Sequence, residues 1–122
     1  MESEISFEEF KECIILVEGK RDVEALKSIG FKRIFAVHKI GFGVRERVEQ
    51  IVSSEGHSNN FCVLMDFDFA GKKLCSQVRS VLMDLGVREE TRFRKMLRRE
   101  GISHVEGLRS FVVSNKIGRV GV

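Results

Sequence analysis

The sequence predicts an α/β fold in which a parallel sheet of about four strands carries helices on both faces. Unbroken apolar runs at residues 13–17 and 61–65 are typical of strands buried on both faces, as the strands of parallel sheets are. Each run is followed by a segment whose apolar residues recur at helical spacing. Because strand and helix alternate in this way, we expect parallel strands joined by right-handed crossovers.

The first half of the chain contains two predicted strand–helix units. Residues 13–17 form the first strand, and a helix over about residues 20–29 follows it and ends at Gly30. Residues 32–38 are predicted to form the second strand. The second helix spans about residues 44–54, where valine and isoleucine recur at i, i+4, i+7 and i+8.

The second half begins with the third strand, at residues 61–65, and continues into a long amphipathic helix that ends at Gly86. A further helix is predicted from about Arg88 to Arg99. Beyond Gly101 the pattern weakens, and residues 102–113 are expected to hold a short edge strand and a helical turn. Three apolar residues place one face of the last full helix against the core: Phe93, Met96 and Leu97.

Length and composition favour a single domain, which we place at residues 1–114, with a flexible C-terminal tail at residues 115–122. No apolar stretch approaches the roughly 20 residues of a membrane span, and the N-terminus is acidic where a signal peptide is basic. We therefore expect a cytoplasmic protein with no membrane partner. The three cysteines show no zinc spacing and predict no disulfide framework, and the net charge of +3 permits a nucleic-acid partner.

Acidic residues follow two of the predicted strands. Glu18 ends the first strand, and Asp66 and Asp68 end the third strand. In a doubly wound sheet these strands are neighbours, so the carboxylates should meet at the C-terminal edge, where open α/β sheets bind ligands. Residues at i and i+2 of a regular strand point to opposite faces, so the chain must leave the strand here. Gly71, and Gly19 after the first strand, are the predicted structural turn residues.

Such a carboxylate cluster predicts a magnesium site. Negative charges that lie close together repel unless a cation neutralises them. Oxygen ligands of this kind suit Mg²⁺, for which Mn²⁺ is a substitute, and one or two carboxylates typically bind the ion together with substrate phosphate. We predict that Glu18, Asp66 and Asp68 hold the ion, which would polarise a phosphodiester. Asp-x-Asp at a strand end also occurs as a plain solvated turn, and Glu18 in register favours the metal site.

Two motifs resemble the signature motifs of the Toprim domain, which topoisomerases, bacterial primases, nucleases and 5S ribosomal RNA maturases share. They are residues 17–20, with Glu18, and residues 66–71, with Asp66 and Asp68. The resemblance spans about residues 12–86, and the chain is most similar to the small, stand-alone Toprim proteins near the maturases. It implies a Rossmann-like Toprim fold in which Asp66 and Asp68 bind Mg²⁺ and Glu18 is a further ligand or general acid/base. All three would then be catalytic.

Seven basic residues are candidates for phosphate or nucleic-acid binding. Lys20 begins the first helix, where backbone N–H groups favour anions, although a solvated first-turn residue explains it equally well. Lys72 and Lys73 open a helix whose positive end they do not complement, so a substrate phosphate explains them better. The other four lie on the last predicted helix as a basic stripe, for which a solvated helix face is the alternative: Arg88, Arg92, Lys95 and Arg99.

Weaker candidates accompany these residues. His38 is the last residue of the second predicted strand, and His104 lies close to Glu106 in the sequence, but lone histidines are usually structural. Asp22 is either an acid that supports the metal-binding carboxylates without binding the ion, or an ordinary residue at the start of a helix. The second interpretation is preferred.

These features predict Mg²⁺-dependent phosphodiester chemistry on RNA or DNA, by a small nuclease or RNA-processing factor. The absence of tyrosine disfavours topoisomerase chemistry, and 122 residues do not hold the template-binding and zinc modules of a primase. The alternative is a non-catalytic metal- and nucleic-acid-binding module of a ribonucleoprotein or repair assembly, with a protein partner. A nucleotide-binding phosphotransferase would need a phosphate loop, and the sequence contains none.

Overall fold

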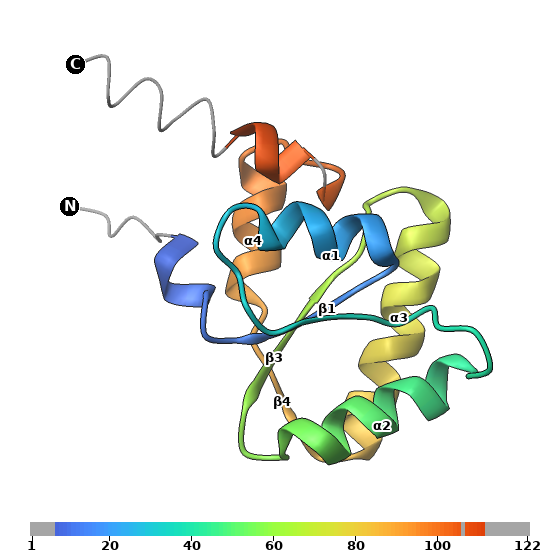
Figure 1. Ribbon diagram of the computed structural model, residues 1–122. Coiled ribbons are helices and arrows are strands. Elements are labelled where there is room, and N and C mark those ends of the chain that lie inside the picture. Colours follow the sequence, from blue (N-terminus) through green and yellow to red (C-terminus); the bar gives the residue numbers. More distant parts are fainter. Residues whose placement is uncertain (1–6, 106, 112–122) are drawn as a thin grey trace, which may run out of the picture.

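The computed structural model describes residues 7–105 and 107–111, and it contains a four-stranded parallel sheet in the order β2-β1-β3-β4 (Figure 1). The strands are β1 (Ile14–Val17), β2 (Ile34–Ala36), β3 (Asn60–Leu64) and β4 (Arg88–Glu89). The helices are the 3₁₀ turn η1 (Phe7–Phe10) and the α-helices α1 (Lys20–Lys27), α2 (Val44–Glu55), α3 (Phe69–Asp84) and α4 (Arg92–Arg99).

The central strand β1 sets the register of the sheet. Its last residue, Val17, lies opposite Ala36 of β2 and opposite Leu64 of β3. The three strands therefore end together, and the residues that follow them emerge along one C-terminal edge. Side chains of β1 are fully buried, which explains why its run is apolar at every position.

Each face of the sheet has its own apolar core. Ile14 and Leu16 of β1 belong to the cluster that contains the buried residues of α2 and α3. Ile15 and Val17 belong to the other cluster, with residues of α1 and α4. Figure 1 shows the same division, with α1 and α4 on one side of the strands and α2 and α3 on the other. In the second core the ring of Phe93 stacks on Phe10 and Phe31, at centroid distances of 4.6 and 5.5 Å.

The predicted α/β class, the four-stranded parallel sheet, the β1–β3 pairing and the helices on both faces are confirmed. The helices predicted over 20–29 and 44–54 and the long helix before Gly86 are present, with ends shifted by a few residues. None of the described helices is both long and apolar enough to cross a membrane. The domain boundary at residue 114 and the tail at 115–122 lie outside the described residues.

The helix predicted from Arg88 to Arg99 is wrong in its first turn. Residues 88 and 89 form β4, and α4 begins only at Arg92. The reason is a sheet contact, because the N–H of Glu90 donates to the carbonyl oxygen of Phe61 and prolongs the β3–β4 pairing. The edge strand predicted within 102–113 is also wrong for the described residues, which are helical at 107–111 and contain no strand there.

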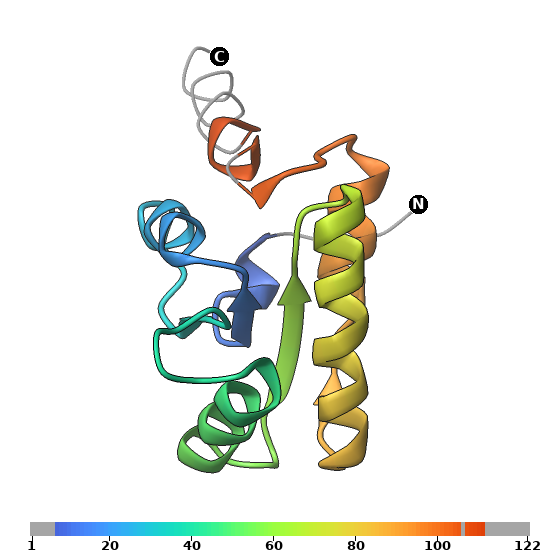
Figure 2. The same cartoon turned by 90° about the vertical axis from the view of Figure 1, so that its right-hand side faces the viewer.

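Figure 2 shows the chain after α4 crossing above the C-terminal ends of the strands and reaching the side on which α1 lies. We call residues 100–105 the crossing segment. Two hydrogen bonds hold it to the loop after β3. The N–H of Phe67 donates to the carbonyl oxygen of Ser103 at 2.8 Å, and the N–H of Val105 donates to Oδ1 of Asp66 at 3.2 Å. The segment is therefore bonded directly to the edge at which the predicted acids lie.

A charged hydrogen-bond pair joins β4 to the start of α4. The guanidinium of Arg92 donates to both carboxylate oxygens of Glu90, at 2.9 and 3.0 Å, and also lies 3.7 Å from Glu9. Hydrogen bonding from Arg92 lowers the pKa of Glu90 below its ordinary value. Because the pKa is lowered in the folded state, the pair stabilises the fold above the ordinary glutamate pKa of about 4.3 and loses this effect as the pH falls through the folded value.

We therefore expect Arg92→Gln to lower the free energy of unfolding at neutral pH and to have little effect once Glu90 is protonated. Urea unfolding of the parent and the variant at pH 7 and at a pH below the lowered pKa of Glu90 measures this difference. Arg88→Gln is the control, because Arg88 is exposed on β4 and makes no ion pair with any described residue. A loss that is equal at both pH values would contradict the assigned role of the pair.

Candidate metal centre

Asp66 and Asp68 lie at the C-terminal edge, in the short connection between β3 and α3. Asp68 is the N-cap of α3, and its Oδ1 accepts a hydrogen bond from the N–H of Gly71 at 2.7 Å. Oδ1 of Asp66 accepts the hydrogen bond from Val105. Each carboxylate is thus held through one oxygen by a backbone N–H group, and its second oxygen is left for another partner.

Gly71 explains how both acids reach one site. It lies in the first turn of α3, and a Cβ added to it would lie 2.0 Å from the carbonyl oxygen of Asp66. Its role is therefore close approach of helix and loop, not the turn before the helix that the sequence predicted. Gly19, the other predicted turn residue, caps α1 in an extended conformation, and a Cβ there would have nothing within 4 Å. No turn depends on it.

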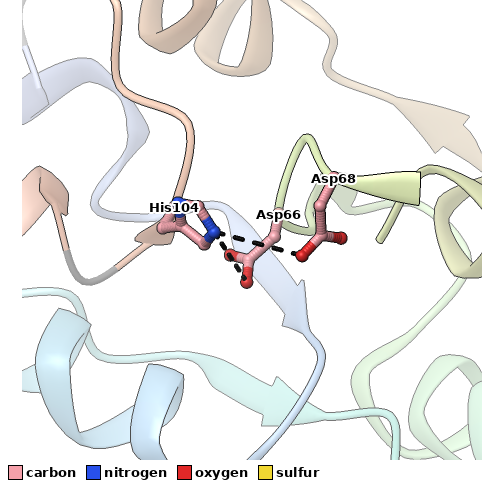
Figure 3. Close-up of side chains that lie close together, drawn as sticks. All are labelled: Asp66, Asp68 and His104. Atoms are coloured by element: carbon pink, nitrogen blue, oxygen red, sulfur yellow. Dashed lines mark ion pairs between the residues drawn. The ribbon is translucent and has the colours of Figure 1, made fainter. Parts of the chain in front are cut away.

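His104, from the crossing segment, completes the cluster. Its Nε2 lies 4.0 Å from Oδ2 of Asp66 and 4.0 Å from Oδ2 of Asp68, as Figure 3 shows. One ligand atom from each of the three residues lies within 4.8 Å of the others. On its other side the ring is next to Ser103, whose Oγ is 2.9 Å from Nδ1. We refer to Asp66, Asp68 and His104 as the Asp–Asp–His centre.

Glu18 lies at the same edge but outside this group. The β1–β3 register places it beside Met65, and its Oε2 is 3.8 Å from Nε2 of His38. In the structure its carboxylate therefore faces the end of β2, whereas Asp66 and Asp68 face the crossing segment. The prediction that Glu18 binds the metal directly stays a prediction. The sequence also left His104 as a weak candidate, and its partner Glu106 lies outside the described residues.

Three lysines that the sequence predicted to bind phosphate lie in the helices that follow β1 and β3. Lys20 begins α1, and Lys72 and Lys73 lie in the first turns of α3; all are exposed and none pairs with a described acid. Asp22 behaves as the preferred interpretation predicted, since its Oδ2 accepts a hydrogen bond from the N–H of Gly19 at the start of α1.

The predicted basic stripe is divided by the structure. Arg88 is on β4, which pairs with the first residues of β3 and so lies at the end of the sheet opposite the acids. Arg92 is bonded to Glu90, so its charge is already paired within the fold. Lys95 and Arg99 remain exposed on α4, without an ion pair to any described residue.

Two further arginines of α4 contact the loop that carries the two aspartates. The guanidinium carbons of Arg94 and Arg98 lie 4.5 and 5.8 Å from the ring centre of Phe67, the residue between the two aspartates. These cation–π contacts attach α4 to the side of that loop that faces it.

The centre is open to solvent. The side chains of Asp68 and His104 are 54% and 56% exposed, and that of Asp66 is 25% exposed. A groove of about 530 Å³ lies between α1 and residues 107–111, where Arg21 and Arg109 are among its lining residues, but no member of the centre lines it. The acids therefore present a surface that a large substrate can reach, unlike the enclosed pockets that bind small molecules.

The cysteines do not contribute a metal ligand. Cys13, Cys62 and Cys75 are free, and burial raises the pKa of each thiol above its ordinary value. Because only the thiolate binds metal strongly, these residues act as small apolar groups of the core.

Comparison with known proteins identifies the family. No family model matches the chain, but it is 31% identical over 115 residues to a UPF0292 protein of Methanosarcina barkeri, covering 90% of this chain and 76% of that protein. This chain belongs to the UPF0292 family. The UPF0292 protein of Methanocaldococcus jannaschii is 30% identical to it over 114 residues, covering 85% of this chain and 81% of that protein.

A solved structure supports the same fold for this UPF0292 protein. The structure, of a protein from Aquifex aeolicus, superposes with a TM-score of 0.68 at 28% sequence identity and covers 81% of this chain and 88% of that one. A solved structure therefore has the same fold as this chain over most of its length.

The contact at Gly71 yields a stability test. Gly71→Ala forces its Cβ against the Asp66 backbone, which has to move, so we expect a loss of about 1–3 kcal/mol in the free energy of unfolding. Gly19→Ser is the matched control and should be nearly neutral, because its Cβ enters open space and serine is favoured at a helix N-cap. Urea unfolding of both variants checks this, and equal losses would show that the close approach does not constrain the site.

Proposed function

We propose that this UPF0292 protein binds a divalent cation at Asp66 and Asp68 and carries out phosphodiester chemistry on nucleic acid, as a small nuclease or RNA-processing factor. The observation that carries the proposal is the pair of aspartates at the C-terminal edge, each with one oxygen bonded to a backbone N–H and the other facing His104 without a hydrogen bond. Hard, pre-positioned carboxylate oxygens of this kind fit Mg²⁺ or Mn²⁺. The resemblance of residues 17–20 and 66–71 to the Toprim motifs supports the same function.

The bound cation would supply a Lewis acid that polarises the phosphodiester and offsets charge on the attacking or leaving oxygen. Glu18 is 37% exposed at the same edge, and we assign proton transfer to its carboxylate, which lies 3.8 Å from Nε2 of His38. Lys20, Lys72 and Lys73 are assigned to the flanking phosphates, since each is exposed without an acidic partner among the described residues.

A polymeric substrate suits the surface better than a small molecule does. The acids are exposed at the sheet edge and lie outside the groove beside α1. Phe69, next to Asp68, is 84% exposed, and an unburied aromatic ring is a platform on which a base can stack. Carboxylates for a cation, lysines for phosphates and a ring for a base together favour RNA or DNA as the partner.

One observation favours the second candidate function, a non-catalytic metal- and nucleic-acid-binding module. The carboxylate of Glu18 pairs with His38 and does not join the Asp–Asp–His centre. If this pairing persists with substrate bound, the edge holds metal and nucleic acid without an acid or base in reach. Turnover separates the two functions.

We expect cleavage of single-stranded or structured RNA and DNA probes to require Mg²⁺ or Mn²⁺ and to stop in chelator. Glu18→Gln should lower the rate by about 10²- to 10⁴-fold with little change in nucleic-acid affinity. Asp68→Asn should abolish metal-dependent cleavage while the fold remains, because asparagine also caps helices well. Cleavage that persists in chelator would overturn the proposal, and tight metal-dependent binding without turnover would favour the non-catalytic module.

Nucleic-acid affinity should fall as salt rises, with a slope of log affinity against log salt of about −0.7 to −0.9 per phosphate neutralised. We expect Lys72→Gln with Lys73→Gln to make the slope shallower by roughly one to two units. Fluorescence anisotropy at several salt concentrations measures it. The matched control is Lys95→Gln with Arg99→Gln on the exposed face of α4. A change confined to that control pair would place the nucleic acid along α4 and away from the aspartates.

A further inference from the structure

We propose that His104 is a third protein ligand of the metal, through Nε2, and that its nitrogen makes the centre prefer Mn²⁺ to Mg²⁺. The inference rests on the proposed metal site, because it assigns a ligand to the same cation. It differs from the carboxylate triad predicted from the sequence, in which the third ligand is Glu18 on β1.

The three side chains are close enough to share one ion after small side-chain rotations. Two atoms bound to one cation at about 2.1 Å each lie at most about 4.2 Å apart. Nε2 of His104 is 4.0 Å from the Oδ2 atom of each aspartate, within that limit. A direct N–H···O hydrogen bond would have a length of about 2.7–3.2 Å, and the ring makes such a bond to neither aspartate. One ligand atom from each of the three side chains lies within 4.8 Å of the others, so small side-chain rotations would bring all three to bonding distance of one ion.

The oxygens that face His104 are the uncommitted ones. Backbone N–H groups of Gly71 and Val105 already occupy the two Oδ1 atoms, so an ion taken up at the Oδ2 atoms breaks no hydrogen bond of the fold. Figure 3 shows that Nε2 of His104 faces one oxygen of each carboxylate. The three free donor atoms therefore converge without a change in the backbone.

The position of the imidazole is set independently of the ion. The crossing segment is bonded to the β3–α3 loop on either side of His104, through the carbonyl oxygen of Ser103 and the N–H of Val105. Oγ of Ser103 lies 2.9 Å from Nδ1. With the proton on Nδ1 donated to this hydroxyl, Nε2 presents its lone pair to the carboxylates, which is the arrangement that metal-binding histidines need.

The donor set decides the choice of cation. Mg²⁺ is satisfied by oxygen ligands and retains its water, whereas imidazole favours the transition metals. Mn²⁺ accepts both carboxylate and imidazole, so two aspartates and one histidine should raise its affinity relative to that of Mg²⁺.

Titration of the full chain with Mn²⁺ and with Mg²⁺, and electron spin-echo spectroscopy of the Mn²⁺ form, test the inference. We expect the parent to bind Mn²⁺ more tightly and to show coupling to a directly bound ¹⁴N nucleus. His104→Ala should remove this coupling and lower Mn²⁺ affinity by at least about tenfold, with a smaller loss for Mg²⁺. His57→Ala is the matched control, an exposed histidine before β3 at the other end of that strand, and should retain both properties.

The outcomes separate this inference from the proposed function. If Asp68→Asn weakens metal binding but His104→Ala leaves it unchanged or tightens it, His104 is an ion-pair partner that competes with the cation, and the inference is overturned while the proposed site stands. If neither ion binds the parent, both fall. Thermal unfolding of His104→Ala in chelator should match the parent, which shows that a lost affinity is not a lost fold.

Discussion

The close approach between Gly71 and the backbone of Asp66 is the constraint on which the edge of the sheet depends. The first turn of α3 lies so near the end of β3 that a Cβ at this position would meet a carbonyl oxygen at 2.0 Å. Asp68 strengthens the same junction by capping α3 at the N–H of Gly71. The chain therefore leaves the buried strand abruptly, and two acids that would point to opposite faces of a regular strand both reach the edge.

The buried part of this arrangement could be predicted from local sequence. Strands buried on both faces are apolar at every position, so β1 and β3 could be predicted from their unbroken apolar runs. The acidic residues could be predicted to lie at the strand ends because they follow these runs directly. Their adjacency followed from the topology of alternating strands and helices. The role of Gly71 was only partly predicted, because its partner is a backbone carbonyl whose position no residue pattern records.

The parts that were missed depend on contacts between distant segments. His104 meets Asp66 because the segment after α4 crosses the strand ends, and nothing in the sequence around it marks that path. The start of α4 was misplaced for a similar reason. Residues after Gly86 have helical charge spacing, but pairing with Phe61 of β3 holds the first of them in a strand. Tertiary hydrogen bonds outweighed local propensity there.

Specific contacts join α4 to the loop that carries Asp66 and Asp68. Arg94 and Arg98 contact the ring of Phe67, while Phe67 donates its N–H to the crossing segment that carries His104. One residue between the two aspartates is therefore fixed by α4 on one side and by the crossing segment on the other. Because all three proposed ligands are attached to this loop or to the segment bonded to it, a cation bound by them would tie that segment to β3. Metal binding should then stabilise the region after α4 more than the sheet, which β1 and β3 already hold together through their buried side chains.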